Sequence, residues 1–365
     1  MEQVDVKGVA VETFYIEAIA LLKQLISTPS FSREEDRTAE IIRECLSRHH
    51  VPSEKYLNNV WSKNRYFDNS RPVVLLNSHH DTVRPNAGYS VDPFDPVEAD
   101  GKLFGLGSND AGGAVVCLLA AFLYFYDRQD LPFNLVFAAT AEEEISGHQG
   151  VEILLPELPP VTCGIVGEPT LLKMAVAEKG LLVLDCVAHG VAGHAARNEG
   201  VNAIYKAITD IRWFQHFSFP RTSPYLGPVH MAVTSVQTTN TAHNVVPSEC
   251  CFVVDIRVNE QYTFEELLAE IRLHVGSEIT PRSTRLRPSF IDERHPLVLA
   301  GRQLGLDAYG SPTCSDRALM NFPTLKLGPG DSARSHSADE YIFTEEIRQG
   351  ITVYIQLLEQ LKSLL

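Results

Sequence analysis

The sequence predicts an α/β fold: a doubly wound, mostly parallel sheet that is interrupted by an inserted ferredoxin-like α+β domain. Short, wholly apolar strands alternate with amphipathic helices in the first part of the chain, as in parallel sheets that are buried on both faces. From Leu181 onward the order changes to β-α-β-β-α-β, and beyond residue 286 the first pattern returns. We therefore expect a discontinuous main domain over 1–179 and 287–365 and an inserted domain over 180–286.

Hydrophobic periodicity defines most of the elements, and capping residues mark several of their ends. Phe14, Ile19 and Leu22 recur at helical spacing near the N-terminus, and Thr263 precedes Glu265 as an expected helix cap in the insert. In the main domain, helices are predicted over 12–27, 33–49, 114–126, 296–304 and 345–364, and strands over 73–77, 134–140, 163–166 and 323–327. In the insert, strands are predicted over 182–188, 229–237, 249–258 and 283–290, and helices over 202–217 and 263–275.

The composition is that of an acidic globular protein. The 365 residues are 44% hydrophobic and 21% charged, and the formal net charge of −15 argues against nucleic acid and anionic membranes as partners. Seven cysteines without a C-x-x-C pair favour a reducing compartment over a disulfide scaffold or a zinc ribbon. We expect no export signal at the N-terminus and no membrane span, since no apolar run approaches about 18 residues. The cytoplasm is therefore the expected location.

Potential metal ligands follow the predicted strands of the main domain. Because the carboxyl ends of parallel strands lie along one edge of a sheet, these distant side chains are expected to converge there. Imidazole and carboxylate groups are suitable ligands for a divalent metal such as zinc, and the set is large enough for two ions that share one carboxylate. The candidates are His79, His80 and Asp81 after the first strand, Asp110 before the next helix, Glu142 to Glu144, Glu168 and His336.

Each motif also has a purely structural interpretation. A single histidine at a strand end is more often structural, although Asp81 in H-x-D could hold the second ring nitrogen of His79. Asp110 could be a helix N-cap, and three consecutive glutamates are usually a solvated turn. The joint occurrence of these motifs in this order is what favours a metal site.

The combined motifs resemble those of the di-zinc deacylase and carboxypeptidase family, which includes acetylornithine deacetylase, succinyl-diaminopimelate desuccinylase and glutamate carboxypeptidase. The matching motifs are H-x-D at 79–81, G-x-x-D-x-x-G at 107–113, acidic-Glu-Glu at 142–144, G-E-P-T at 167–170 and the late His336. The resemblance implies two Zn²⁺ ions per subunit, with Co²⁺ or Mn²⁺ able to substitute. It implies that His79 and Glu168 hold one ion, that Glu144 and His336 hold the other, and that Asp110 bridges them ahead of a cis peptide to Ala111.

The resemblance also implies roles for residues that hold no metal. Asp81 would orient His79, and Glu143 would be the general base that takes a proton from metal-activated water. The assignment of Glu143 as base and Glu144 as ligand depends on the family pattern. The family commonly has Met-Lys after the bridging aspartate, whereas Ala111 and Gly112 stand there in this chain.

The insert resembles the lid and dimerisation domain of the same family. His194 in the loop 190–204 would reach an active site, often that of the dimer mate, and stabilise the oxyanion. Asn244 and Arg257 match substrate-positioning motifs, the arginine as a fork for a carboxylate. Without the resemblance, His194 would be interpreted as an exposed loop residue and Arg257 as a surface charge. The expected assembly is a homodimer through residues 180–286.

The function that these features predict is zinc-dependent hydrolysis of an amide. The expected substrate is a small N-acyl amino acid that loses an acetyl or succinyl group, and the motifs are most similar to those of enzymes for N-acetylornithine in arginine biosynthesis. A zinc dipeptidase or carboxypeptidase and a succinyl-diaminopimelate desuccinylase are the alternatives. A non-catalytic binding protein is disfavoured because binding alone needs no base at Glu143, and a serine hydrolase lacks its G-x-S-x-G motif.

Overall fold

A computed structural model of the chain describes residues 6–365 and divides into two compact units. The first unit runs to Val176 and resumes over Ile291–Tyr309 and Ser315–Leu365, and the second comprises Ala177–Phe290 and Gly310–Cys314. The second unit thus takes in a few residues on each side of the expected insert and one further short segment. The start of the N-terminal stretch, in which the sequence predicts no export signal, lies outside the described residues.

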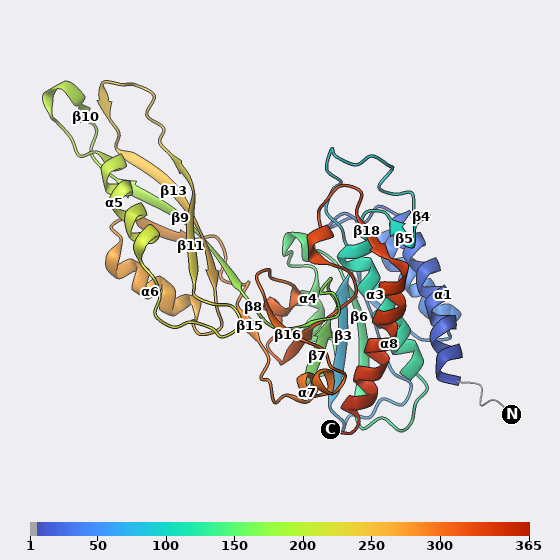
Figure 1. Cartoon of the computed structure of the whole chain (residues 1–365). Helices are drawn as coiled ribbons and strands as arrows, with labels where there is room; N and C mark the ends of the chain where they lie inside the picture. The colour runs from blue at the N-terminus through green and yellow to red at the C-terminus, as the bar shows by residue number, and fades with distance from the viewer. Residues whose placement is uncertain (1–5) are drawn as a thin grey trace. The chain divides into compact units, whose positions relative to one another are not determined.

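The central sheet has nine strands among the described residues, and its four middle strands are parallel, which confirms the predicted fold class (Figure 1). Antiparallel strands flank this parallel centre. The order is β1 (Glu54–Tyr56), β2 (Asn59–Lys63), β6 (Asn134–Thr140), β3 (Val73–His79), β7 (Cys163–Val166), β17 (Thr324–Lys326), β8 (Met174–Glu178) and β15 (Ser289–Phe290), with β16 (Ala308–Ser311) paired to β8.

Helices cover both faces of the sheet, and every residue of β3 and β6 is buried. Figure 1 shows α1 (Val6–Ile26), α3 (Gly113–Phe125) and α8 (Thr344–Leu361) packed together against one face. On the other face Leu75 and Val136 pack against the short α4 (Val151–Leu154). The remaining elements of this unit are α2 (Asp36–Arg48), α7 (Pro296–Gln303) and a small sheet of β4 (Val97–Ala99), β5 (Lys102–Phe104) and β18 (Tyr341–Phe343).

The core helix α3 corrects one expectation from the sequence. The segment Ser108–Phe125 is long and apolar enough to cross a membrane, although no such segment was expected. In the structure 83% of this segment is buried inside the first unit. Its apolar character is accounted for by the packing of α3 against the sheet, α1 and α8.

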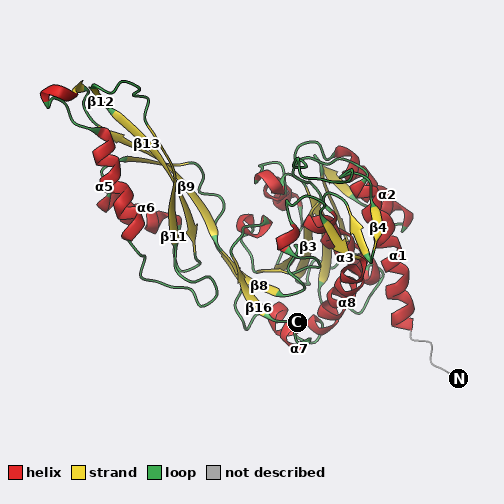
Figure 2. Cartoon of the chain, turned by 45° about the horizontal axis from the view of Figure 1, so that its top comes forward, coloured by secondary structure: helices red, strands yellow, loops and turns green. Residues whose placement is uncertain are grey.

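The second unit has the predicted β-α-β-β-α-β order (Figure 2). Its antiparallel sheet has the order β11-β13-β9-β14, which is the strand order of a ferredoxin-like unit. The elements are β9 (Gly180–His189), β10 (Gly193–His194), α5 (Ala203–His216), β11 (His230–Gln237), β12 (Val245–Val246), β13 (Glu249–Val258), α6 (Phe264–His274) and β14 (Glu278–Pro281).

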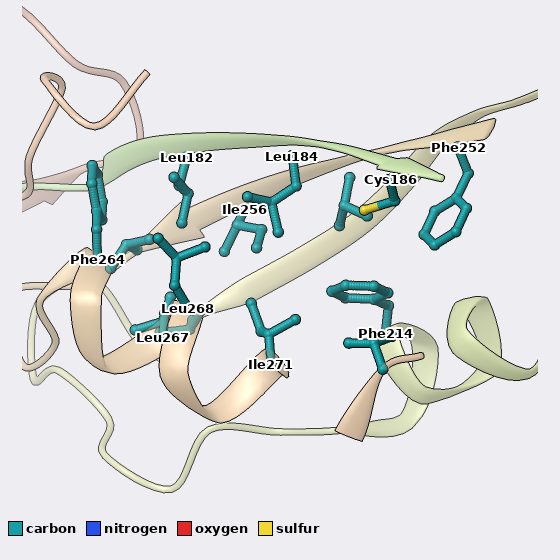
Figure 3. Packing of buried hydrophobic residues seen from close by; sticks show 14 of the residues in the cluster. Leu182, Leu184, Cys186, Phe214, Phe252, Ile256, Phe264, Leu267, Leu268 and Ile271 are labelled. Carbon is teal, nitrogen blue, oxygen red and sulfur yellow. The ribbon is translucent and has the colours of Figure 1, made fainter. Parts of the chain in front are cut away.

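Alternation in β9 and β13 builds the core of this unit. Every second side chain of these strands is buried, and Figure 3 shows Leu184 and Phe252 pointing from the sheet toward Phe214 of α5 and Ile271 of α6. The Thr263 side chain caps α6 in a capping box, as predicted.

The predicted strand at 283–290 was wrong. The fourth strand is β14, where Glu278–Pro281 pairs with β9, and only Ser289–Phe290 of the predicted segment is extended into a ladder. That ladder joins β8 rather than the sheet of the insert. The four-residue β14 contains a proline at its end, so its sequence has little of the apolar alternation that identifies a strand.

Candidate active site

The topology places the predicted ligands at one edge of the central sheet. The parallel neighbours β6, β3, β7 and β17 all end at this edge. His79 is the last residue of β3, and the turn after β6 carries Glu143 and Glu144. Glu168 follows β7 and His336 follows β17, so the segments that carry the candidate ligands all leave the sheet on the same side.

Asp110 lies between the two histidines. Its Oδ1 is 3.3 Å from Nε2 of His79, and its Oδ2 is 3.7 Å from Nε2 of His336. The residue belongs to the turn Ser108–Gly112, just before α3, and the peptide bond to Ala111 is cis, as the resemblance implied. The two oxygens of one carboxylate therefore face two different imidazoles.

A second carboxylate lies beside each imidazole. Glu168 Oε1 is 3.9 Å from Nε2 of His79, and Glu144 Oε2 is 2.9 Å from Nε2 of His336. The potential ligand atoms of His79, Asp110 and Glu144 all lie within 4.8 Å of one another, and the same holds for His79, Glu143 and Glu168. The structure thus brings together the five side chains that the family resemblance implied as metal ligands.

The chemistry of this donor set fits a divalent metal. Nδ1 of the buried His79 is 3.0 Å from the backbone oxygen of Asp81, so Nδ1 donates its proton and the Nε2 lone pair is available in the neutral ring. Nε2 is the atom that faces Asp110 and Glu168. Imidazole nitrogen and carboxylate oxygen at one centre are ligands that zinc and similar ions accept.

Asp81 contacts more groups than His79, the one residue that it was predicted to orient. Its buried carboxylate accepts the backbone N–H groups of Glu143 and Glu144, both at 3.1 Å, and the hydroxyl of Ser32 at 2.7 Å. Its Oδ1 is also 3.4 Å from Nδ1 of His79. Burial opposes its ionisation, but the contacts with His79 and Ser32 and the backbone N–H of Glu144 outweigh burial and lower the pKa of Asp81. Asp81 therefore holds the turn that carries the predicted base.

That turn has an unusual backbone. Glu142 and Ser146, on either side of Glu143 and Glu144, have φ angles of 55° and 48°, a region that residues other than glycine seldom occupy. The buried carboxylate of Glu35 accepts the N–H of Glu142 at 3.2 Å, so two buried acids hold the donors of this turn. Such locally unfavourable backbone persists only where the surroundings fix it.

The predicted base has an environment that suits proton transfer. Burial raises the pKa of Glu143, and the neighbouring carboxylates of Glu168 and Asp316 raise it further, against the opposing effect of His79. Asp316 is itself buried and accepts hydrogen bonds from Asn77 and Thr140 at 2.9 and 2.8 Å. A carboxylate whose pKa is raised above its usual value accepts a proton more readily and can later return it.

The two histidines that face Asp110 have raised pKa values in this cluster of acids. The hydrogen bond to Glu144 is the main cause for His336, whose pKa is raised to about 9. Burial opposes the charged form of His79, but contacts with Asp110 and Asp81 outweigh it and raise its pKa well above the usual value. The neighbouring His80 differs, because burial lowers its pKa to about 4 and its Nε2 donates to the backbone oxygen of Asn58. His80 is a structural residue, as the sequence suggested.

Sequence reasoning missed Glu340 and Asn109. The buried carboxylate of Glu340 accepts the backbone N–H groups of Gly107, Asn109 and Asp110. The Asn109 side chain pairs with both backbone groups of Asp331, in the segment that leads to His336. Glu340 stands four residues after His336 in S-H-S-A-D-E, so its place beside a known motif was the one available signal.

The remaining predicted residues belong to the second unit. His194 is exposed, and its Nδ1 accepts the N–H of Ala196, which leaves Nε2 to carry the proton of the neutral ring. The backbone oxygen of Asn244 accepts the N–H of Ala195, so His194 and Asn244 lie close together around the pairing of β10 with β12. Arg257 lies elsewhere, on β13, where it forms a two-pronged contact with Asp255 at 2.8 and 3.1 Å.

Known proteins with similar sequences belong to one family of metallopeptidases and related hydrolases. The family model "Peptidase family M20/M25/M40" matches residues 75–360. Succinyl-diaminopimelate desuccinylase 2 of Ruegeria sp. (strain TM1040) is 26% identical, over 94% of each chain. The succinyl-diaminopimelate desuccinylase of Paracoccus denitrificans (strain Pd 1222) is 27% identical, over 78% of this chain and 82% of its own.

Solved structures share the fold. The M20 family metallo-carboxypeptidase Sso-CP2 of Sulfolobus solfataricus superimposes with a TM-score of 0.73 at 15% identity, over 96% of this chain and 100% of its own. A dinuclear metal-binding peptidase of the M20 family from Bacillus subtilis gives a TM-score of 0.72 at 16% identity, over 97% and 98% of the two chains. With the family model spanning most of the chain and the donor set in place, the chain belongs to peptidase family M20/M25/M40 and is a metallohydrolase that acts on amide bonds.

Proposed function

We propose that the protein is a zinc-dependent deacylase that removes a small acyl group from an N-acyl amino acid. The observation that carries this proposal is the position of Asp110, whose two oxygens face two separate imidazole–carboxylate pairs, with Glu143 at the edge of one of them. His79 and Glu168 would hold one ion and Glu144 and His336 the other, with Asp110 shared. Bound divalent ions would supply Lewis-acid polarisation of the amide and a lowered pKa for water.

The chain's own residues would supply the proton transfers. A Glu143 carboxylate oxygen takes a proton from the attacking water and then returns it to the nitrogen of the leaving amine. The raised pKa of Glu143 supports both steps, because a carboxylate that binds a proton more readily than usual can take it from water and hold it until the amine leaves. Asp81 holds the backbone of Glu143 and Glu144, so that the base and the neighbouring ligand keep a fixed separation.

The acyl group is the finer part of the proposal. The curated relatives described above are succinyl-diaminopimelate desuccinylases, which favours an N-succinyl amino acid as the first substrate to test. The N-acetylornithine-type substrate expected from the sequence motifs is the second candidate to test. A panel of N-succinyl and N-acetyl derivatives of diaminopimelate, ornithine, citrulline and lysine, beside dipeptides, compares the candidates by kcat/KM. Hydrolysis of dipeptides alone would reject the deacylase and leave a peptidase.

The role of Glu143 is tested by Glu143→Gln. The variant should bind two Zn²⁺ ions per chain, because the five proposed ligands are intact, and should lose about 10²–10⁴-fold in kcat. Glu142→Gln is the matched control, since it removes a buried carboxylate of the same turn that faces Arg33 rather than the ligand cluster. It should keep most of the turnover. Wild-type turnover by Glu143→Gln would contradict the mechanism.

We further propose a cytoplasmic homodimer in which the second unit provides the contact and His194 serves the active site of the partner subunit. Support comes from the Nε2 proton of His194, which is free to donate to an oxyanion. Asn244 and Arg257 remain proposed substrate contacts, although Arg257 would have to share its guanidinium with Asp255. Sedimentation that shows a fully active monomer would refute the exchange of His194 between subunits.

A further inference from the structure

The carboxylate of Glu340 gathers the backbone donors of the turn that carries Asp110. Its Oε1 accepts the N–H groups of Asn109 and Asp110, both at 2.9 Å, and its Oε2 accepts that of Gly107 at 3.1 Å. The side chain is 2% exposed, so these bonds form away from water. The turn cannot shift without leaving buried N–H groups unpaired, which would cost about 1–3 kcal/mol for each group.

A second set of bonds joins the same turn to the segment that precedes His336. The Asn109 side chain accepts the N–H of Asp331 at 2.9 Å and donates to the backbone oxygen of Asp331 at 3.1 Å. Its amide nitrogen is also 3.4 Å from the hydroxyl of Ser335, the residue before His336. Because Glu340 stands shortly after His336, the segments that carry Asp110 and His336 are fastened to each other on both sides of the histidine.

The carboxylate of Glu340 provides two acceptor oxygens for the turn of Asp110. A buried acid is costly unless strong hydrogen bonds satisfy it. Glutamine has the same shape but only one acceptor atom, so it would place an NH₂ group against either Gly107 or the pair Asn109 and Asp110. Fixing the turn therefore requires acceptors at both oxygens of residue 340.

We propose that Glu340 is a positioning residue for Asp110: it fixes the turn at which the two proposed metal sites meet, and it thereby sets the affinity for both ions. This proposal rests on the proposed function, in which Asp110 is the ligand that the two ions share. Replacing a residue that orients a metal ligand typically costs 10- to 100-fold in metal affinity or activity. A change at Glu340 should fall in this range without any loss of a ligand.

Asp339 offers a matched control. It is the adjacent acid, and its carboxylate also accepts a backbone N–H, that of Ser90 at 2.8 Å, together with the Ser90 hydroxyl at 2.6 Å. It tethers the same segment to a different loop and leaves the turn of Asp110 alone. Asp339→Asn thus tests whether loosening this segment is sufficient, whereas Glu340→Gln tests the positioning of Asp110.

The experiment measures Zn²⁺ binding to wild type, Glu340→Gln, Glu340→Asp and Asp339→Asn by competition with a chromogenic chelator, beside the denaturant midpoint and kcat at saturating Zn²⁺. We expect Glu340→Gln to weaken both ions 10- to 100-fold and Asp339→Asn to change neither by more than about twofold. Glu340→Asp keeps both acceptor oxygens on a shorter side chain, so its Zn²⁺ affinity should lie between those of wild type and Glu340→Gln. If Glu340→Gln does not fold, the Zn²⁺ affinity of Glu340→Asp tests the proposal instead.

Two results would overturn the proposal. One is wild-type affinity for both ions in Glu340→Gln, or in Glu340→Asp where only that variant folds. The other is an equal loss in Asp339→Asn, which would make the effect a general loosening of the segment. If wild type itself binds fewer than two ions or hydrolyses no amide, it is the proposed function that fails, so the two failures are distinguishable.

Discussion

Replacing Asp81 with asparagine should slow turnover more than it weakens substrate binding. The carboxylate accepts the N–H of Glu143 through Oδ1 and that of Glu144 through Oδ2, and it is fully buried. An amide of the same shape keeps one acceptor, so its NH₂ group must face one of the two N–H groups. The turn that carries the base must then move or leave a buried donor unpaired.

The size of the effect follows from the bond that is lost. A hydrogen bond to a charged group contributes about 1.5–3 kcal/mol. Since about 1.4 kcal/mol corresponds to a factor of ten, a kcat lower by roughly 10- to 150-fold is expected if the base is productive only with the turn in place. KM should change by only a few fold, because no proposed substrate contact is altered. Zn²⁺ affinity should also fall, since Asp81 faces His79.

The assay is steady-state kinetics on Asp81→Asn over a range of Zn²⁺ concentrations up to saturation. Excess Zn²⁺ should refill the sites but should not restore kcat, because the turn of Glu143 is still displaced. Ser32→Ala is the matched control, since it removes the hydroxyl bond at 2.7 Å to the same carboxylate without touching the turn. Full recovery of kcat at high Zn²⁺ would refute the reasoning and would reduce Asp81 to an orienting group for His79.

Two further predictions concern protonation and stability. Because the pKa of His336 is raised to about 9, its ring carries a proton at pH 7 until a metal displaces it. Zn²⁺ binding should therefore release protons, and Zn²⁺ affinity should increase as pH rises toward 9. Calorimetry in two buffers of different ionisation enthalpy measures the number of protons released, and binding without proton release would contradict the prediction. Phe252→Ala should destabilise the second unit by about 3–5 kcal/mol in denaturant unfolding, because Phe252 is buried against Phe214, whereas Tyr205→Ala at an exposed site should change stability by less than about 0.5 kcal/mol.

The convergence of the ligands could be predicted because it depends on regular structure. Val73–His79 begins with four apolar residues and is buried on both faces, and such a strand belongs in the middle of a parallel sheet with its carboxyl end at the ligand-binding edge. Once the other parallel strands were recognised, His79, Glu144 and Glu168 had to come together. Asp110 is the exception, since it precedes α3 and was placed by its glycine-flanked motif rather than by periodicity.

The second unit shows where periodicity stops being sufficient. Its two long strands, β9 and β13, alternate over ten residues each and were found from the sequence. The edge strand Glu278–Pro281 is short and ends in proline, and it acquires its extended form from pairing with β9. The tertiary partner decides the conformation of such a segment, so local sequence led instead to the wrong segment at 283–290.

The backbone contacts of the acids that hold the site together could not be predicted from the sequence, although Asp81 itself was singled out by the H-x-D motif. The reason follows from their partners. Asp81, Glu35 and Glu340 each accept backbone N–H groups of irregular turns, which helix and sheet ladders leave unpaired. A backbone N–H has no sequence identity, so nothing in the acceptor's neighbourhood marks its partner. In the composition, these three acids are counted among the residues that give the chain its formal net charge of −15, which by itself suggests acids on the protein surface. All three are buried, and each accepts at least one backbone N–H of the turns that carry Asp110, Glu143 and Glu144. Part of the protein's acidic side chains is therefore committed to fixing the geometry of the candidate active site.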